Sequence, residues 1–543
     1  MEDATHAAAA PATDFPIDWE EGDEELEWEW DEMHLPHALP ALSQDYIRAL
    51  LDGVGYRYRA MGLPARMLTR VWNGYGFMAF KLDAPPEQHE ELLAGATDGR
   101  RGLIPGTRAY WARTLPELQA MYAEIEAMTA QEPPATLAEA WARAWTCVER
   151  AWQIHFYVIA GAYQVLDDLA DRYEAVVDGG SAAEAFELVA GAIPELHDIE
   201  VELEALTAAA VSMPEVASRL QTVPAAGLAE IAALPGGPAF VVALEDFLTR
   251  HGHLGHVSED LMDGSWRDDP RPLIADIGRR VGRPSAPAAE RWAARAEAAD
   301  ARADAVRSLL ADRPADLAEF NRLLATAREI GPLTEGHNYW IDRMAADHLR
   351  RFTRRVGRRL VRDGVLGDPE DVAYLHRSEI AELIGTPVDR RALIEERRAR
   401  HAAQSGIRPP RKVGKVEEPA PDAKADRFDG ARYDPIDSRT LKGTGASAGT
   451  VRGRARVVFG AADFERVDAG DIVVATASNP GWVPLFAIAG GFVTDSGGVL
   501  SHAAVVAREF GLPAVVGTGD ATRRITDGEF ISIDGTSGLV TLG

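Results

Sequence analysis

Cysteine is nearly absent from this sequence of 543 residues, which holds only Cys147. A single thiol excludes a disulfide within the chain and fits a reducing compartment. Cys147 stands in the apolar helical pattern WARAWTCVERAW, which favours a buried small hydrophobe over a reactive nucleophile. The fold therefore depends on packed apolar cores, and the length of the chain predicts three or four domains.

Positive charge is also scarce, because 57 Lys and Arg residues stand against 85 Asp and Glu residues, which gives a formal net charge of −28. A chain of this charge repels nucleic acid and anionic membrane surfaces. Apolar runs of about 18 residues, the length of a membrane span, are missing. The first 30 residues have neither the basic nor the apolar region of a signal peptide. We expect a soluble cytoplasmic protein with no nucleic-acid or membrane partner.

Alternation of apolar and polar residues, typical of strands, is rare in the first 400 residues, and the composition divides the chain into four parts. Residues 1–30 form an acidic arm, whose tryptophans predict docking onto the body. Residues 31–401 have apolar positions three and four apart, which predicts a large, mainly helical domain. Residues 402–435 are rich in proline and charge, which predicts a linker. Residues 436–543 carry short β-branched runs and one helix, which predicts a compact α/β domain.

One segment, TDSGGVLSHAAVVAREFGLPAVVGT, combines residue types that suit phosphate chemistry. It contains, in order, Thr494, Gly497, Gly498, Ser501 and His502. The glycines predict a turn after a strand, and Ser501 is a good N-cap that places His502 in the first turn of a helix. A helix N-terminus attracts phosphate and disfavours protonation of the imidazole, which can then attack phosphorus. The segment predicts that His502 carries a phosphoryl group; the alternative is that His502 only caps the helix.

The same segment resembles the phosphohistidine signature of the phosphoenolpyruvate-utilising enzymes, a superfamily that includes rifampin phosphotransferase and phenylphosphate synthase. The matching residues are Thr494, Gly497, Gly498, Ser501, His502, Ala503, Ala504, Ala507, Arg508, Glu509, Gly511, Pro513, Ala514 and Val515. Residues 443–458 resemble the first strands of that domain, with Ala448 where the family often has proline. The resemblance implies an α/β domain that swivels between a loading and an unloading site. It also implies phosphate binding by Thr494, Gly497, Gly498, Ser501 and Arg508.

Three segments of the helical region, 28–42, 247–270 and 334–375, resemble, in this order, parts of the acceptor-binding domain of the same enzymes. The helical domain is therefore implied to hold the acceptor. A base or cation beside a phenol, whose pKa is about 10, would favour the phenolate. The candidates for such groups are His34, His155, His253, His256, Glu259, His337 and Asn338. His155 lies in an apolar helix, so a buried core histidine is its alternative.

A metal site is not predicted. His251, His253 and His256 form a cluster, but no cysteine or second ligand pair joins them at a spacing typical of zinc sites. Glycine-rich strands of an ATP-grasp fold and a G-x-x-x-x-G-K-[ST] loop are missing, and the chain ends soon after His502 without a phosphoenolpyruvate-binding barrel. The resemblance implies a separate ATP-grasp partner that binds ATP and Mg²⁺ and loads His502.

The resemblance as a whole implies one subunit of a two-component aryl phosphotransferase that degrades aromatic compounds, similar to phenylphosphate synthase and a cresol-phosphorylating synthase. The β-phosphoryl of ATP would pass through His502 to a phenolic hydroxyl, giving aryl phosphate, AMP and phosphate. An antibiotic or another alcohol is an alternative acceptor, and a much wider pocket would favour it. A regulatory phosphocarrier is the non-enzymatic alternative, against which the large helical domain argues.

Overall fold

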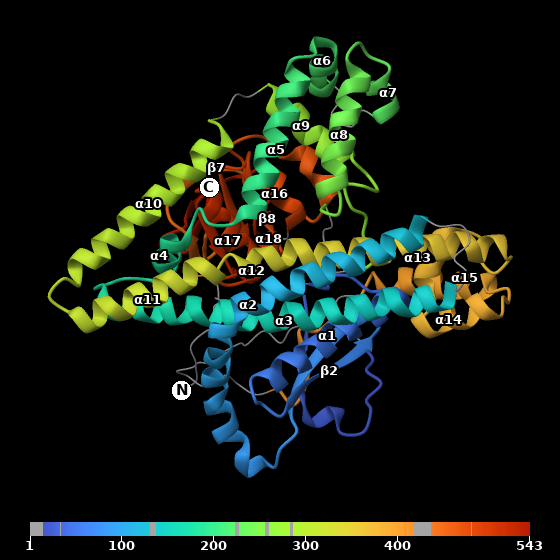
Figure 1. The fold of residues 1–543 in the computed structure, drawn as a ribbon, viewed down its shortest axis with the longest axis horizontal. Coiled ribbons are helices and arrows are strands. Elements are labelled where there is room, and N and C mark those ends of the chain that lie inside the picture. Colours follow the sequence, from blue (N-terminus) through green and yellow to red (C-terminus); the bar gives the residue numbers. More distant parts are fainter. Residues whose placement is uncertain are drawn as a thin grey trace, which may run out of the picture.

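The computed structural model describes residues 15–32, 34–130, 137–222, 227–255, 260–282, 286–407, 409–416, 436–478 and 480–543. It confirms a multidomain protein with a large, mostly helical part followed by a C-terminal sheet domain (Figure 1). The helices of the first part are α1 (Ala41–Ala60), α2 (His89–Ala130), α3 (Leu137–Val176), α4 (Ala182–Phe186), α5 (Pro194–Val211), α6 (Pro214–Thr222), α7 (Leu228–Ala232), α8 (Gly237–His251), α9 (Arg271–Val281), α10 (Ala288–Leu309), α11 (Pro314–Ile330), α12 (Leu333–His337), α13 (Met344–Arg362), α14 (Arg377–Gly385) and α15 (Arg391–Gln404).

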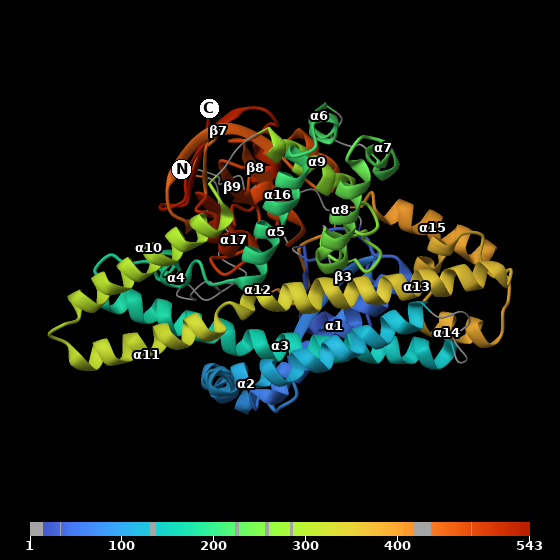
Figure 2. The same cartoon turned by 45° about the horizontal axis from the view of Figure 1, so that its top comes forward.

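Helix α3 forms the centre of the helical part because apolar residues cover most of its circumference. Trp141, Trp145 and Trp152 are all buried on it, and Cys147 is a buried free thiol, as expected. A helix that is apolar on several sides has to be covered on each of them. Helices α1, α2, α11 and α13 provide this cover, and α2, α3 and α13 run alongside one another in Figures 1 and 2.

A small antiparallel sheet anchors both ends of the helical part. Its strands are β1 (Glu27–Trp30), β2 (Ala65–Trp72), β3 (Tyr75–Leu82) and β4 (Lys412–Gly414), in the order β2-β3-β1-β4. Trp28 and Trp30 are buried in its apolar core, so the acidic arm docks onto the body as predicted. Strand β4 belongs to the predicted linker, yet Val413 pairs with Trp28. Residues 417–435 lie outside the described residues, and the domain boundaries stay a prediction.

The C-terminal domain is built on an eight-stranded sheet of order β5-β12-β11-β7-β8-β9-β10-β6. Its strands are β5 (Thr440–Lys442), β6 (Thr444–Ser447), β7 (Thr450–Val457), β8 (Ile472–Ala475), β9 (Gly491–Thr494), β10 (Ala514–Val516), β11 (Phe530–Asp534) and β12 (Leu539–Leu542). Strands β7 to β10 are parallel, and the outer strands are antiparallel. The parallel strands β8 and β9 are buried on both faces, as parallel strands require. Helices α16 (Val483–Phe486), α17 (His502–Phe510) and α18 (Ala521–Arg524) complete the predicted α/β domain.

The C-terminal domain packs against the helical part beside α5 and α10 (Figure 2). Trp292 of α10 meets Phe510 of α17 edge to face, with 5.4 Å between the ring centroids. Val499 and Leu500, in the loop before α17, belong to the apolar core of the helical part. This packing holds the N-terminus of α17 against the helical part.

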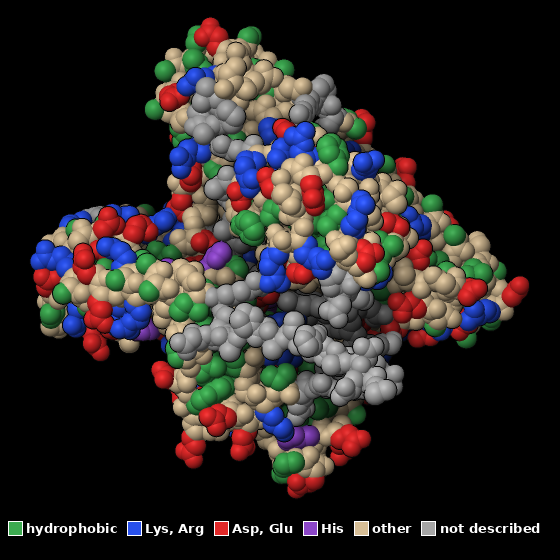
Figure 3. All heavy atoms as spheres, turned by 180° about the vertical axis from the view of Figure 1, so that it is seen from behind, with side chains coloured by type: hydrophobic (Ala, Val, Ile, Leu, Met, Phe, Trp, Pro, Cys, Tyr) green, Lys and Arg blue, Asp and Glu red, His purple; other side chains and the backbone are tan. Residues whose placement is uncertain are grey.

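Two features of the described residues bear on membrane and nucleic-acid partners. Within the described ranges, no helix combines the length and the apolar character that crossing a membrane requires. Acidic and basic side chains are interspersed over the described part of the rear face (Figure 3). Such mixing gives no large field of one sign on that face.

Candidate active site

The N-terminus of α17 presents Ser501 and His502 as the motif predicts. Ser501 is the N-cap residue, but its hydroxyl makes no capping hydrogen bond. Gly497 before it has φ of 99°, and a Cβ there would lie 2.8 Å from the Ser501 side chain, so the turn requires glycine. In the described part of the chain, the buried Oγ of Ser501 has no hydrogen-bond partner. This hydroxyl is therefore available to a ligand at the start of the helix.

His502 is held by a residue of the helical part. Its Nδ1 lies 2.7 Å from Oε2 of Glu335, which belongs to α12, and the two side chains are only 8% and 3% exposed. The carboxylate accepts a hydrogen bond from Nδ1–H, so the lone pair of the neutral ring lies on Nε2. Nε2 is buried and has no partner among the described residues. Nε2 is thus the nitrogen that can bond to phosphorus.

A cavity of about 430 Å³ lies between the two parts, and His502 and Ser501 line it. The helical part contributes an apolar wall consisting of Leu50, Leu51, Val54, Met67, Met78, Trp152, Phe156, Ile159 and Ala160. Four of the predicted acceptor residues, His34, His155, His337 and Asn338, line the same cavity. Residues 150 and more apart in the sequence are therefore brought together around His502.

Three buried polar residues that line the cavity, His155, His337 and Asp342, lie close together. Nδ1 of His155 lies 2.7 Å from Oδ1 of Asp342, and Nε2 of His337 lies 3.9 Å from Oδ2. Burial, together with the nearby positive charges of His34 and Arg57, holds the pKa of His155 well below its ordinary value. Burial lowers the pKa of His337 to about 4 and raises the pKa of Asp342. Both imidazoles are therefore neutral at pH 7.

Other predicted residues lie away from this cavity. His253 is buried against Tyr339, with 4.5 Å between the ring centroids. Arg508 is not among the residues that line the cavity; it donates to the carbonyl of Ala446 at 2.8 Å and lies over the ring of Phe186. Burial lowers the pKa of Arg508 to about 10. The geometry supports neither an acceptor role for His253 nor phosphate binding by Arg508.

The remaining predicted residues have these placements. Thr494 ends β9, and its buried hydroxyl donates to the carbonyl of Ser496 at 2.8 Å, so it shapes the turn that precedes α17. Gly498 accepts the backbone N–H of Ser501 at 3.0 Å. His256 and Glu259 lie outside the described residues. His251, which stands near His253 and His256 in the sequence, has its Nε2 3.1 Å from Oε2 of Glu202.

Sequence reasoning missed several residues of the cavity. Glu335, the partner of His502, stands two positions before His337, in the segment 334–375 that resembles the acceptor-binding domain. Asp342 lies in the same segment but five positions after His337. The cavity also contains Arg57 and Arg100, which supply positive charge. The signal that could have identified Glu335 is a carboxylate beside a candidate histidine in a segment that resembles the acceptor-binding domain.

The other end of α17 makes stability depend on pH. Glu509 accepts the backbone N–H of Gly191 at 2.8 Å, across the contact between the two parts. Burial raises the pKa of Glu509 from 4.5 to about 7, and the nearby charge of Glu187 adds to the rise. The hydrogen bond from Gly191 and the charges of Arg295 and Arg508 lower the pKa and offset part of the rise. Since the unfolded carboxyl ionises first, stability is fully present below pH 4.5 and falls by on the order of 3 kcal/mol as the pH rises to about 7.

The Glu509→Gln variant should lack this slope because its amide does not titrate. Thermal unfolding of both proteins between about pH 4.5 and pH 7 measures the difference. An equal slope in the two proteins would show that another group is responsible.

Two family models match this chain. Residues 467–538 match the mobile domain of PEP-utilising enzymes, and residues 154–335 match the fourth domain of rifampicin phosphotransferase. The first match contains His502, and the second contains His155 and Glu335. His502 and its carboxylate partner thus lie in regions that match two different family models.

Several curated proteins are similar to the chain. A chondramide synthase of Chondromyces crocatus is 31% identical over 558 residues, covering 97% of this chain and 14% of that protein. A rifampicin phosphotransferase of a Streptomyces species is 35% identical over 387 residues, covering 69% of this chain and 43% of that enzyme. An uncharacterized phosphotransferase of Bacillus subtilis is 28% identical over 307 residues, covering 56% of this chain and 37% of that protein. The chain spans less than half the length of each of these relatives.

Proposed function

This chain belongs to the superfamily of PEP-utilising enzymes, related to rifampicin phosphotransferase, and from this premise we propose that it is a phosphotransferase with a phosphohistidine intermediate at His502. One observation carries the proposal. Glu335 holds Nδ1 of His502 at 2.7 Å, which leaves Nε2 as the phosphorus-binding nitrogen of a residue that lines the cavity. The arrangement corresponds to a carrier domain docked at its acceptor site.

The transfer step uses groups that are already in place. The hydroxyl oxygen of the acceptor attacks phosphorus, the bond between phosphorus and Nε2 breaks, and the hydroxyl proton passes to an imidazole of the cavity wall. Glu335 keeps Nδ1 protonated, so the leaving group is a neutral imidazole and not an imidazolate. The unpaired Ser501 hydroxyl and the N–H groups at the start of α17 are suited to hold the phosphoryl oxygens.

The acceptor that fits best is a phenolic compound of modest size. A volume of about 430 Å³ lies in the lower part of the range for pockets that bind drug-sized molecules. The aromatic and aliphatic wall, with Trp152 and Phe156, suits a ring, and imidazoles that can contact a hydroxyl line the same cavity. A phenol or cresol enters with room to spare.

A larger antibiotic or another alcohol is the second candidate, and the 35% identity with a rifampicin phosphotransferase favours it. The cavity volume of about 430 Å³ favours the smaller acceptor. A carrier that only regulates other proteins would not need a cavity lined by its own histidine and by acceptor-side imidazoles. We therefore place catalysis ahead of regulation.

The donor in this proposal is a separate ATP-grasp protein that binds ATP and Mg²⁺. It transfers the β-phosphoryl of ATP to His502 and releases the γ-phosphoryl to water as phosphate, with AMP as the second product. Neither of the two regions that match a family model is described as nucleotide-binding, which supports placing the nucleotide on a partner in this proposal.

The test separates the donor from the acceptor. The chain is loaded chemically with phosphoramidate, which phosphorylates histidine, and is then given p-cresol or rifampicin. We expect phosphate on His502 by mass spectrometry, followed by its appearance as cresyl phosphate in the ³¹P spectrum. Transfer to rifampicin alone would select the second candidate, and hydrolysis without transfer to any alcohol would contradict the phosphotransferase. Loading from β-labelled ATP and Mg²⁺ by an ATP-grasp protein tests the donor separately.

A further inference from the structure

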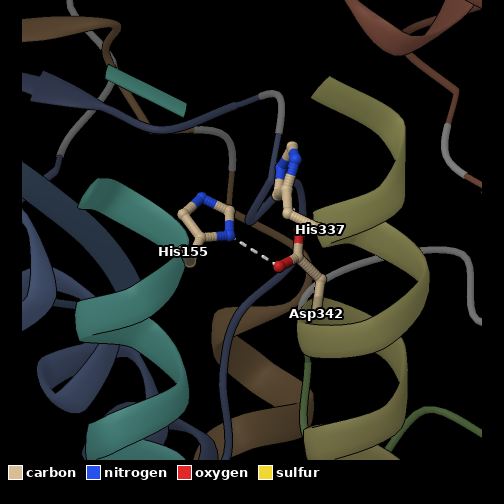
Figure 4. A group of neighbouring side chains, drawn as sticks. All are labelled: His155, His337 and Asp342. Carbon is tan, nitrogen blue, oxygen red and sulfur yellow. Dashed lines mark hydrogen bonds and ion pairs between the residues drawn. The ribbon is translucent and has the colours of Figure 1, made fainter. Parts of the chain in front are cut away.

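His155, His337 and Asp342 form a group that the transfer step does not fully explain. Figure 4 shows the three side chains side by side, with His155 on α3, His337 at the end of α12 and Asp342 in the turn that follows α12. One ligand atom from each lies within 4.8 Å of the other two, and all three residues are buried. All three also line the cavity that contains His502. Two imidazoles and a carboxylate with an open side form the ligand set of many catalytic metal sites.

An unusual turn of the backbone creates this group. His337 and Asp342 are five residues apart, and at 3.6 residues per turn an α-helix would place them about 140° apart around its axis. The segment Asn338–Arg343, labelled η4, is instead a π-helical turn. Its i→i+5 pattern brings residues five apart onto nearly the same side. Such turns are rare and occur frequently at functional sites.

The second ring nitrogen of His337 is arranged as in metal-binding histidines. Nδ1–H of His337 donates to the carbonyl of Leu333 at 2.7 Å, which fixes the tautomer and leaves the lone pair on Nε2. Nε2 is the atom that faces Asp342. Histidines that bind metals almost always donate their other N–H to a carbonyl or carboxylate in this way. A core histidine would not need its free nitrogen to face a buried carboxylate.

We propose that His155, His337 and Asp342 bind one divalent transition metal ion, of which zinc suits the ligands best. Two neutral imidazoles and one carboxylate match zinc sites that keep a coordination position open. Mg²⁺ prefers oxygen ligands and fits this group poorly. On binding, Asp342 gives up to solvent the proton through which it contacts Nδ1 of His155, and the ion takes the place of that proton. His155 stays neutral because it keeps its own proton on Nε2.

The position of the site gives the ion a role that rests on the proposed function. Its open position faces the cavity, where it binds the acceptor hydroxyl and lowers the pKa of that hydroxyl. The hydroxyl proton is released to solvent in the cavity, the oxygen attacks phosphorus on His502, and the bond between phosphorus and Nε2 breaks. A transition metal at the acceptor is distinct from the Mg²⁺ that accompanies ATP on the partner.

Calorimetric titration of the metal-stripped full chain with Zn²⁺ alone tests the site. We expect one ion per chain, proton release on binding, and a visible absorption spectrum of nitrogen and oxygen ligation when Co²⁺ replaces Zn²⁺. Removing a residue that only supports a metal ligand typically weakens metal binding by about 10–100-fold. Asp342→Asn and His337→Gln remove ligands themselves, so each should weaken zinc binding by more than this. His253→Gln, which changes a buried histidine outside the cavity, should bind zinc like the original chain.

Absence of zinc binding to the original chain would overturn the proposal, as would unchanged binding in both ligand variants. If Asp342→Asn does not fold, as judged by thermal unfolding, His337→Gln and the Co²⁺ spectrum of the original chain decide the question. The titration contains neither a phosphoryl donor nor an acceptor. Failure of zinc binding therefore leaves the phosphotransferase proposal intact, and failure of phosphoryl transfer leaves the metal site intact.

Discussion

Replacing His502 with alanine should abolish phosphoryl transfer while leaving the fold intact. The covalent route depends on Nε2, and the residues that follow His502 in the first turn of α17, Ala503, Ala504 and Val505, carry no nucleophile. Removal of a nucleophile from a covalent mechanism costs on the order of 10⁶-fold in rate. The fold should tolerate the change because His502 belongs to none of the apolar clusters of the described residues. Glu335 keeps a contact with the amide nitrogen of Asn338 at 3.3 Å.

Intact-mass analysis after loading with phosphoramidate, together with cresyl phosphate formation, measures this loss. His89→Ala is the matched control, because His89 lies outside the cavity and bonds only to the carbonyl of Ala84 among the contacts described. The control should be loaded and should transfer as the original chain does. Turnover that survives in His502→Ala would remove His502 from the mechanism.

Glu335→Gln should lower transfer to the acceptor by on the order of 10²- to 10⁴-fold while sparing the loading of His502. A glutamine can donate its N–H₂ to Nδ1 of the phosphorylated ring, which leaves Nδ1 without a proton, so the ring has to leave phosphorus as an imidazolate and not as a neutral imidazole. Placing the proton on the wrong nitrogen of a catalytic histidine, by replacing the aspartate of a serine protease triad, costs about 10⁴-fold. Glu335 belongs to the helical part, so it contacts His502 only when the carrier domain is docked there.

Single-turnover kinetics separate the two steps of this variant. The phosphorylated Glu335→Gln chain should form normally and then release phosphate to p-cresol slowly at every pH, with little change in acceptor KM. Glu195→Gln is a suitable comparison, because Glu195 is a nearby buried carboxylate that bonds to Trp340 and not to His502. Equal losses in loading and in transfer would mean that Glu335 only supports the fold.

The local features of the carrier motif were predictable from the sequence because they depend on neighbouring residues. The glycine turn, the N-cap position of Ser501 and the helix that begins at His502 are all present. The spacing of apolar residues also predicted helix α3, and with it the position of His155 on an apolar helix. Short-range propensities and the apolar period are thus sufficient for the element that carries the chemistry.

The acceptor side was only partly predictable because it depends on contacts between distant residues. Glu335 and His502 are 167 residues apart and meet through the docking of two domains, for which one sequence has no local signal. The turn at Asn338–Arg343 departs from the 3.6-residue period, so a regular helix would have separated Asp342 from His337. Arg508 illustrates the opposite case, because a residue of the motif faces Ala446 and not the cavity.

The pairing of β4 with β1 sets a geometric limit on the carrier domain. Strand β4 fixes the chain to the N-terminal sheet. The first described residue of the C-terminal domain is Ile436. A polypeptide extends at most about 3.6 Å per residue, so the covalent connection from Val416 allows Ile436 a reach of at most about 70 Å. Because β4 pairs with β1, the N-terminal arm holds the point from which the C-terminal domain can move. A phosphate donor therefore has to present its nucleotide within reach of that point.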